Sequence, residues 1–359
     1  MAHRAWGERL LVVGTGLIGT SVGLAARAAG ADVLLEDSDP GRLRLAIQAG
    51  AGRSAEGDLH VDLVVIAVPP RATGLVASTW LELAQGATVT HVCGVQSLPQ
   101  RDVELHGGDL TRFVGGHPIA GRETSGPVYA SADLFHERPW VICPTSVSST
   151  EASNRVAALA DDCGARPVVL DAATHDALLA RLSHVPQLVA SALAGSITGL
   201  DQDRAALAGP GLRDTTRLAD SDPRLWTEIV TANAADVAGA LRDVAQPLLE
   251  LAAALEAGTE AETNAQALLE EGRRGRSMLP GKHGGAPVEL RAVTVVIPDE
   301  PGALARLFGD VAAESVNVED MRVEHATGQP LGIAEILVLP AAYDRLAAAL
   351  RARGWTLAS

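Results

Sequence analysis

Cysteine is scarce in this sequence, and the three cysteines present are isolated from one another. Cys93, Cys143 and Cys163 show no metal-type spacing, and their odd number argues against a disulfide framework. No apolar run approaches the length of a membrane span, and the N-terminal residues lack the pattern of a signal peptide. We therefore expect a cytoplasmic protein that binds no metal and crosses no membrane.

Positive charge is also scarce. The 359 residues include 29 lysines and arginines against 44 aspartates and glutamates, which gives a net charge of −15. This charge repels nucleic-acid phosphates and anionic lipid headgroups, so neither is an expected partner. The length exceeds what one ordinary hydrophobic core organises and favours two or three domains.

The first 171 residues carry the pattern of an α/β domain. Short apolar runs alternate there with helical stretches, and the runs read LLVVG, ADVLLED, VDLVVIAVP, ATVTHV, RFVGG, WVICP and RPVVL. Near-continuous apolar strands separated by helices are typical of a parallel sheet covered on both faces. Residues 1–171 are therefore predicted to form a doubly wound parallel sheet.

The rest of the chain divides into three parts. Helical periodicity replaces the strand signals over residues 172–277, which predicts an all-helical domain. Residues 278–288 are rich in glycine and proline and are interpreted as a linker. Residues 289–359 read as strand, helix, strand, strand, helix and strand, the order of a ferredoxin-like α+β module.

A glycine-rich loop lies between the first strand and the first helix, in LLVVGTGLIGTSVGLAARAAG. Gly14 permits a tight turn, Gly16 lets the backbone approach a pyrophosphate, and Gly19 lets the helix pack on the strand. A tight turn without nucleotide is the alternative, but the strand-loop-helix context favours a Rossmann-type dinucleotide site. The predicted contact residues are Gly14, Thr15, Gly16, Leu17, Ile18 and Gly19.

The ends of the next two strands complete this site. The segment LLEDSDP places Asp37 where a carboxylate would bond the ribose 2′-hydroxyl. A 2′-phosphate would meet that carboxylate, with Arg42 as the nearest arginine in the sequence, so NAD is favoured over NADP. The strand VVIAVPP ends in Val68 and Pro69, which are expected beside the cofactor.

His117 lies in a second polar loop, VGGHPIAGRETSG. It follows the strand RFVGG, at the carboxyl edge where open α/β sheets bind ligands. A lone histidine in such a loop is ordinarily a solvated turn residue. Here Ser125 and the other polar residues close by favour a catalytic base instead.

Several motifs in this order resemble one family. The glycine loop, GGHPIAGRETSG, SHVPQLVA and GLRDTTRLADSDPRLW are together similar to prephenate dehydrogenases, and PDEPGALARLFGDVAAESVNVEDMRVEH resembles an ACT domain. The resemblance implies NAD-dependent oxidative decarboxylation of prephenate to 4-hydroxyphenylpyruvate, a step of tyrosine biosynthesis. Close relatives use arogenate, which stays open as the alternative substrate.

The resemblance also implies roles for individual residues. His117 would accept a hydrogen bond from the ring hydroxyl and act as the base while hydride leaves the same carbon. Arg217 would bind a substrate carboxylate through its planar guanidinium. A surface ion-pair cluster is the alternative for this arginine motif, and a core histidine is the alternative for His184. The other candidates for the substrate site are Asp214, Arg213, His184, Ser125 and Gly94.

The sequence departs from this family at a strand end that usually reads D-V-x-S-V-K. The stretch here is HVCGVQ, so Gly94 replaces the serine, His91 the acid and Gln96 the lysine. Gln187 likewise replaces the second histidine of S-H-x-P-H. Loss of the hydroxyl costs about 1–3 kcal/mol in the transition state unless water, Gln96 or His91 substitutes for it. Alternatively, the changes indicate a substrate whose ring carries another substituent, such as an amino group, in place of the hydroxyl.

The C-terminal module suggests regulation and assembly. Gly302 at its first strand-helix turn and Asn317 before its second strand match the ACT pattern, which implies an amino-acid effector site. We expect tyrosine there, with a purely dimer-stabilising module as the alternative. This module and the long apolar faces of the helical domain predict a homodimer.

Two further classes stay open. A ligand sensor with weakened catalysis would keep the nucleotide-binding fold, but it would not need both His117 and Arg217. A β-hydroxyacid dehydrogenase or imine reductase would share the glycine loop and a helical second domain. That class would not explain the presence of the histidine motif or of the C-terminal module.

Overall fold

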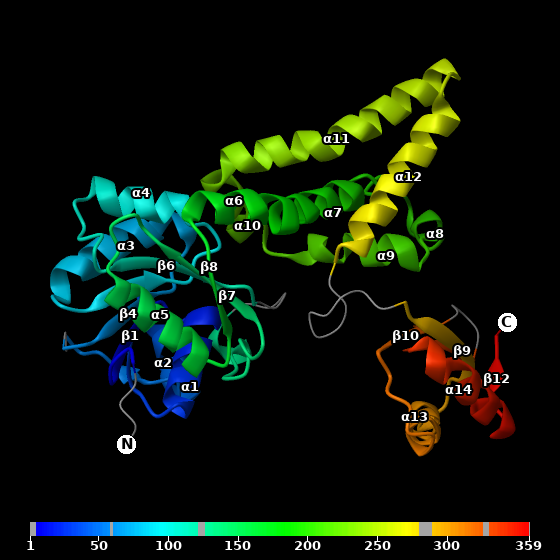
Figure 1. Cartoon of the computed structure of the whole chain (residues 1–359), viewed down its shortest axis with the longest axis horizontal. Helices are drawn as coiled ribbons and strands as arrows, with labels where there is room; N and C mark the ends of the chain where they lie inside the picture. Colours follow the sequence, from blue (N-terminus) through cyan, green and yellow to red (C-terminus); the bar gives the residue numbers. More distant parts are fainter. Residues whose placement is uncertain (1–4, 58–59, 121–125, 280–288, 326–329, 359) are drawn as a thin grey trace. The chain divides into compact units, whose positions relative to one another are not determined.

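The computed structural model describes residues 5–57, 60–120, 126–279, 289–325 and 330–358 (Figure 1). The chain divides into two compact units, Met1–Gln246 and Pro247–Ser359. The first contains the strands and helices around both predicted polar loops, and the second contains the C-terminal module.

The described part of the first unit is built on one eight-stranded sheet. The strands are β1 (Arg9–Val13), β2 (Asp32–Glu36), β3 (Arg53–Ser54), β4 (Leu63–Ile66), β5 (Thr88–His91), β6 (Phe113–Pro118), β7 (Pro139–Pro144) and β8 (Arg166–Val169). Their spatial order is β3-β2-β1-β4-β5-β6-β7-β8. Strands β1 to β6 are parallel, which confirms the predicted Rossmann-type sheet.

Helices cover both faces of this sheet, as the apolar strands require (Figure 1). They are α1 (Leu17–Ala28), α2 (Pro40–Gln48), α3 (Pro70–Leu83), α4 (Ser97–Leu105) and α5 (Thr150–Asp162). Side chains of α1, α2 and α5 share one buried cluster with alternate residues of β1 and β2, and side chains of α3 and α4 share the other. The carboxyl ends of the parallel strands are thereby left for ligands.

Strand β7 differs from the predicted parallel arrangement. It pairs antiparallel with β6, and β8 is parallel to β7. In the described part of the connection from β6 to β7 there is one short 3₁₀ helix, Pro127–Tyr129, and no crossover α-helix. Parallel neighbours need a crossover of that kind, so the chain returns in the opposite direction. The first residues of β7 therefore lie at the carboxyl edge of β6.

A helical segment follows the sheet, as predicted. Its elements are α6 (Ala172–Leu179), the π-helical turn η2 (Ala180–His184), α7 (Val185–Gly195), α8 (Gln202–Ala205), α9 (Pro210–Thr216), the 3₁₀ helix η3 (Arg217–Asp220), α10 (Pro223–Ala232), α11 (Ala234–Ala257) and α12 (Ala261–Ser277). The boundary between the two compact units falls within α11, at Pro247. Buried Ala180, Val185, Val237 and Ala240 form the small core of the segment inside the first unit.

The π-helical turn η2 lies just before a proline. Pro186 lacks the N–H that a regular helix uses, and the turn η2 ends two residues before it. The continuous stretch Ala172–Gly195 is also the one described helix long and apolar enough to match a membrane span, contrary to the sequence-based expectation. Asp176 within it is buried and hydrogen-bonded to the backbone of α4, so this part of the stretch packs as core.

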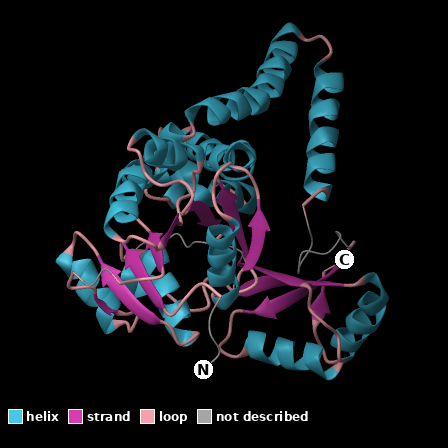
Figure 2. Ribbon diagram, turned by 60° about the vertical axis from the view of Figure 1, so that its left-hand side comes forward, coloured by secondary structure: helices cyan, strands magenta, loops and turns pink. Residues whose placement is uncertain are grey.

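The C-terminal module has the predicted strand and helix order. Its elements are β9 (Arg291–Pro298), α13 (Ala303–Ala313), β10 (Asp320–His325), β11 (Leu331–Val338), α14 (Pro340–Ala352) and β12 (Thr356–Leu357), with sheet order β10-β11-β9-β12. The sheet is antiparallel, and α13 and α14 pack against it through a buried apolar cluster (Figure 2). This is a ferredoxin-like α+β fold.

Candidate active site

The glycine-rich loop after β1 has the backbone shape that a pyrophosphate needs. Gly14 has φ of +97°, a left-handed conformation, and a Cβ there would overlap the Ala67 carbonyl oxygen. A Cβ at Gly19 would overlap the Gly14 carbonyl oxygen, whereas the space around Gly16 is open. The first N–H groups of a helix have no partner within it, so the start of α1 and this loop fit the phosphates of a dinucleotide.

Asp37 holds this loop from the end of β2. Its carboxylate accepts hydrogen bonds from the Thr15 amide at 2.6 Å and from the Thr15 hydroxyl at 2.8 Å. Arg42 pairs with Asp39 at 3.6 Å. A carboxylate beside the loop suits the ribose hydroxyls of NAD and repels the extra phosphate of NADP.

The other predicted cofactor residues frame the same loop. Leu17 and Ile18 form the first turn of α1, and Val68 and Pro69 follow β4. The Thr73 hydroxyl donates to the carbonyl oxygens of Val68 and Pro69, at 3.3 and 3.1 Å, and so fixes that turn. Their contacts with the cofactor stay a prediction.

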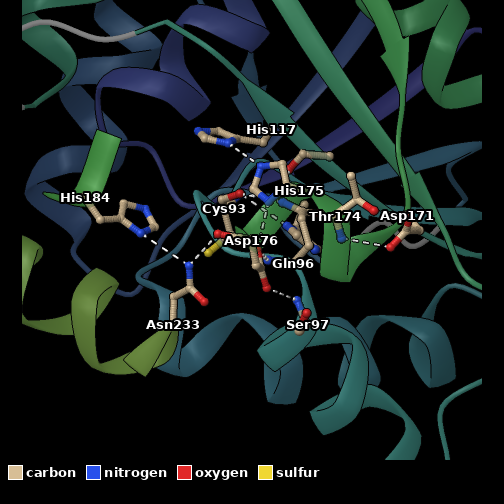
Figure 3. Close-up of polar contacts among 12 residues, drawn as sticks. Cys93, Gln96, Ser97, His117, Asp171, Thr174, His175, Asp176, His184 and Asn233 are labelled. Atoms are coloured by element: carbon tan, nitrogen blue, oxygen red, sulfur yellow. Dashed lines mark hydrogen bonds and ion pairs between the residues drawn. The ribbon is translucent and has the colours of Figure 1, made fainter. Parts of the chain in front are cut away.

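His117 belongs to a chain of three side chains (Figure 3). Its Nδ1 lies 2.9 Å from Nε2 of His175, and Nδ1 of His175 lies 2.8 Å from a carboxylate oxygen of Asp176. An ionised carboxylate only accepts, so His175 donates through Nδ1 and its Nε2 accepts from His117. The proton of a neutral His117 is therefore on Nδ1, and its Nε2 is left as an acceptor.

Burial determines the charge of these groups. It lowers the pKa of His117 to about 3, with neighbouring histidines adding to the effect, and lowers the pKa of His184 to about 4. Burial also opposes ionisation of Asp176, yet hydrogen bonds from His175 and from the backbone keep the pKa of that carboxyl below its ordinary value. The site thus combines a stable carboxylate with a neutral base.

Asp176 also fixes the loop that follows β5. Its carboxylate accepts the backbone N–H groups of Gln96 at 2.9 Å and Ser97 at 2.8 Å, which are otherwise free at the start of α4. Asn233 donates to the Asp176 carbonyl oxygen at 2.8 Å. This one residue therefore connects α6, the sheet edge and the end of α10.

A cavity of about 1050 Å³ adjoins the free side of His117. Its lining is largely apolar and includes Gly94, Val141, His184 and Trp226. The rings of His184 and Trp226 are 6.2 Å apart, edge to face, and Nδ1 of His184 lies 3.4 Å from the Asn233 amide nitrogen. The predicted substrate residue His184 is thus a buried histidine that also lines the cavity, and its contact with substrate stays a prediction.

Gly94 leaves the acceptor nitrogen of His117 uncovered on one side. A Cβ at position 94 would lie 3.7 Å from His117 Nε2, an ordinary contact distance. Gln96 donates instead to the carbonyl oxygens of Cys93 and Gly116, and His91 accepts from the Cys93 amide. Among the described residues neither replaces the missing hydroxyl next to His117.

The predicted arginine motif lies elsewhere on the helical segment. Arg213 and Asp214 are exposed on α9, and Arg217 is exposed at the start of η3. None of the three lines the cavity that holds His117. Gln187, at the position of the second family histidine, donates to the Leu218 carbonyl oxygen at 2.7 Å and so anchors this segment. The candidate Ser125 lies outside the described residues.

His175 and Asp176 were missed by the sequence reasoning. They occur in THDALLARL, a helical stretch in which a histidine and an aspartate look like a polar face. No local signal distinguished them, because consecutive helix residues point about 100° apart and can both lie on a solvent-facing side. In the structure both are buried.

A parallel sheet with this glycine loop, next to a helical segment and a buried histidine, defines the class of nicotinamide-dependent dehydrogenases. Comparison with known families gives the particular one. Residues 22–169 match the model described as prephenate dehydrogenase, nucleotide-binding domain, and residues 171–270 match prephenate dehydrogenase, dimerization domain. The chain belongs to the prephenate dehydrogenase family, and its cofactor is NAD.

Individual relatives agree with this assignment. The probable prephenate dehydrogenase NovF of Streptomyces niveus is 36% identical over 96% of this chain and 98% of its own. The cyclohexadienyl dehydrogenase of Zymomonas mobilis is 30% identical over 63% of this chain and 81% of its own. The structure of Aquifex aeolicus prephenate dehydrogenase with hydroxyphenyl propionate and NAD+ is 27% identical, with a TM-score of 0.68, covering 75% of this chain and 97% of that one.

The tautomer assigned to His117 is tested by Asp176→Asn. An asparagine amide facing His175 moves the donor to Nε2 of that ring, and His117 then carries its proton on the nitrogen that faces the cavity. We expect kcat for the family reaction to fall at least about 100-fold, since the base starts in the wrong tautomer. NAD binding, measured by fluorescence titration, should change little because Asp176 is remote from the glycine loop in the hydrogen-bond network.

Asp171→Asn is the matched control. Asp171 is exposed, caps the same helix α6 by accepting from Thr174, and asparagine caps helices equally well. An unchanged kcat in a folded Asp176→Asn protein, with the melting temperature of the control, would contradict the assigned proton order.

Proposed function

We propose that the protein oxidises prephenate with NAD to 4-hydroxyphenylpyruvate and carbon dioxide. The observation that carries this proposal is the neutral His117, whose Nε2 acceptor faces a largely apolar cavity at the carboxyl edge of the sheet. The family supplies the class of substrate, and the geometry supplies the base that this reaction needs.

His117 accepts the proton of the ring hydroxyl as the C–H bond at the same carbon breaks. The loop Gly14–Gly19 would hold NAD, which would supply the hydride acceptor. The ring carboxylate leaves as carbon dioxide, its bonding electron pair enters the ring, and the proton returns to the oxygen, so no net acid or base is consumed. The resulting aromatic ring supplies the driving force, and the protein provides orientation and a proton acceptor.

A substrate with an amino group on the ring is the second candidate, because of Gly94. A ring hydroxyl that donates to His117 also needs a donor for its own oxygen, and the described residues offer none at position 94. An amino group has more N–H donors, and when protonated it has no lone pair and needs no donor. Arogenate, which differs in the side chain, is the third candidate.

We propose that Arg217, Asp214 and Arg213 contact the substrate from outside the cavity that holds His117.

The first test is NADH formation by the purified protein with prephenate, arogenate and no substrate, using NAD and then NADP. Turnover is expected with prephenate and NAD. His117→Asn should lower kcat by about 10²–10⁴-fold, because the side chain that takes the proton is lost. NAD binding without turnover of any cyclohexadiene would favour a ligand sensor over an enzyme.

Gly94→Ser tests the edited position. A serine hydroxyl there fits next to His117 and donates to the oxygen that gains negative charge in the transition state. We expect kcat/KM for prephenate to rise about tenfold, the equivalent of one hydrogen bond. Gly94→Ala is the matched control, since it adds the same Cβ without the hydroxyl. A decrease in both variants would mean that the space at position 94 is filled by substrate.

We further propose a cytoplasmic homodimer with four parts. Residues 1–171 bind NAD, residues 172–277 form the substrate and dimerisation domain, residues 278–288 are a linker, and residues 289–359 are a regulatory domain. The match to a dimerization domain and the exposed leucines of α11 and α12 support the dimer: Leu248, Leu249, Leu255 and Leu269 are each more than half exposed in the second unit.

The C-terminal ferredoxin-like module is proposed to be an ACT domain that binds tyrosine near Gly302 and Asn317. Gly302 begins α13 in a left-handed conformation, and Asn317 is exposed.

Tyrosine is expected to raise the melting temperature and to inhibit prephenate turnover. Gly302→Ala should abolish the inhibition and leave basal turnover intact, because a Cβ strains the left-handed turn that begins α13. Gly354→Ala is the matched control: Gly354 has a similar positive φ and open surroundings, but follows α14. Equal tyrosine responses in the two variants would contradict an effector site at Gly302.

A further inference from the structure

The reversed direction of β7 brings an arginine to the cavity that holds His117. Because β7 is antiparallel to β6, it begins at the carboxyl edge where β6 ends. The Ile119 amide donates to the Pro139 carbonyl oxygen at 2.8 Å, so the pairing continues beyond the end of β6. Arg138 immediately precedes β7 and is one of the residues that line the cavity.

The spacing along β7 separates Arg138 from the base by a suitable distance. Val141 is opposite His117 in the register and lines the same cavity. Arg138 precedes Val141 by three residues, which is about 10 Å at the usual rise of about 3.3 Å per residue. A six-membered ring with a short acid side chain can span this interval when its ring substituent reaches His117.

The guanidinium of Arg138 is available within the described part of the chain. The residue is exposed. Its backbone carbonyl oxygen accepts a hydrogen bond from the Arg166 amide at 2.8 Å. Its side chain has no hydrogen bond or ion pair among the described residues. Asp133 also lines the cavity, where its carboxylate accepts the Ser131 hydroxyl. Arg138 therefore provides a cation for an anionic substrate in this cavity.

We propose that Arg138 binds the side-chain carboxylate of the substrate, the one that the product retains. This inference rests on the proposed function. Prephenate has two carboxylates, and the one on the ring has to leave as carbon dioxide. A guanidinium paired with it would stabilise the charge that is lost, and would stabilise the ground state more than the transition state. Pairing with the other carboxylate orients the ring toward His117 without that penalty.

Arginine suits this role better than lysine would. Its planar guanidinium donates two parallel hydrogen bonds to one carboxylate, which fixes the direction of the side chain as well as its position. At the mouth of a cavity, that direction decides whether the ring substituent or another ring atom meets His117 Nε2. Arg138 is thus a substrate-binding and specificity residue.

The test compares substrate and product in Arg138→Gln and Arg138→Lys, made in the full-length protein. The product has lost the ring carboxylate, so its affinity reports the side-chain carboxylate alone. We expect KM for prephenate and the inhibition constant of 4-hydroxyphenylpyruvate to rise by the same factor, about 10- to 100-fold for glutamine, the usual effect of losing hydrogen bonds between charged groups. The lysine variant should show a smaller rise, and kcat should stay within about threefold in both.

Arg166→Gln is the matched control, because Arg166 is an exposed arginine of the neighbouring strand that lies 3.9 Å from Glu137 and does not line the cavity. It should leave both constants unchanged. A rise in KM for prephenate with an unchanged inhibition constant of 4-hydroxyphenylpyruvate would overturn the proposal, because Arg138 would then bind the ring carboxylate. No change in either constant would also overturn it, because Arg138 would then bind neither carboxylate. Calorimetric binding of 4-hydroxyphenylpyruvate with NAD present tests Arg138 even without turnover, so a failure of the proposed function stays distinguishable.

Discussion

The carboxylate of Asp176 is the constraint on which the site depends. It is buried, and it is stabilised there because three donors converge on it: the His175 ring and the backbone N–H groups of Gln96 and Ser97. The same contacts decide which nitrogen of His117 carries the proton and where the loop after β5 lies relative to α6. A single negative charge therefore specifies both the architecture of the edge and the direction of proton transfer.

The position of the cavity depends on a second constraint, the antiparallel pairing of β6 and β7. In a fully parallel sheet the residues before β7 would lie at the opposite edge from His117. The observed reversal instead places Val141 opposite the base and puts Arg138, the residue before β7, among the residues that line the cavity. Residues of β6, of the connection from β6 to β7, of β7 and of the helical segment thus share one cavity.

Much of this arrangement was predictable from local patterns. The glycine spacing, the apolar strands and the C-terminal strand and helix order are local signals, and each has the structure it predicts. The direction of β7 was not predictable, because the connection from β6 has no clear periodicity and its described residues form no crossover helix. His175 and Asp176 were not recognised, since their function depends on a long-range meeting with β6. For the same reason the sequence predicts the motif around Arg217 but gives no sign that Arg138 lines the cavity of His117.

The low pKa of His117 is compatible with the proposed role of this residue as a base. A neutral imidazole is needed at the start, and burial favours it by lowering the pKa of His117 to about 3. When Nε2 takes the proton, the new positive charge is connected through His175 to Asp176, whose charge raises the pKa of His117 and so partly offsets burial. The remaining cost is transient, because decarboxylation forms a phenolate oxygen that takes the proton back. The absence of a donor at Gly94 then matters most while that oxygen is gaining charge.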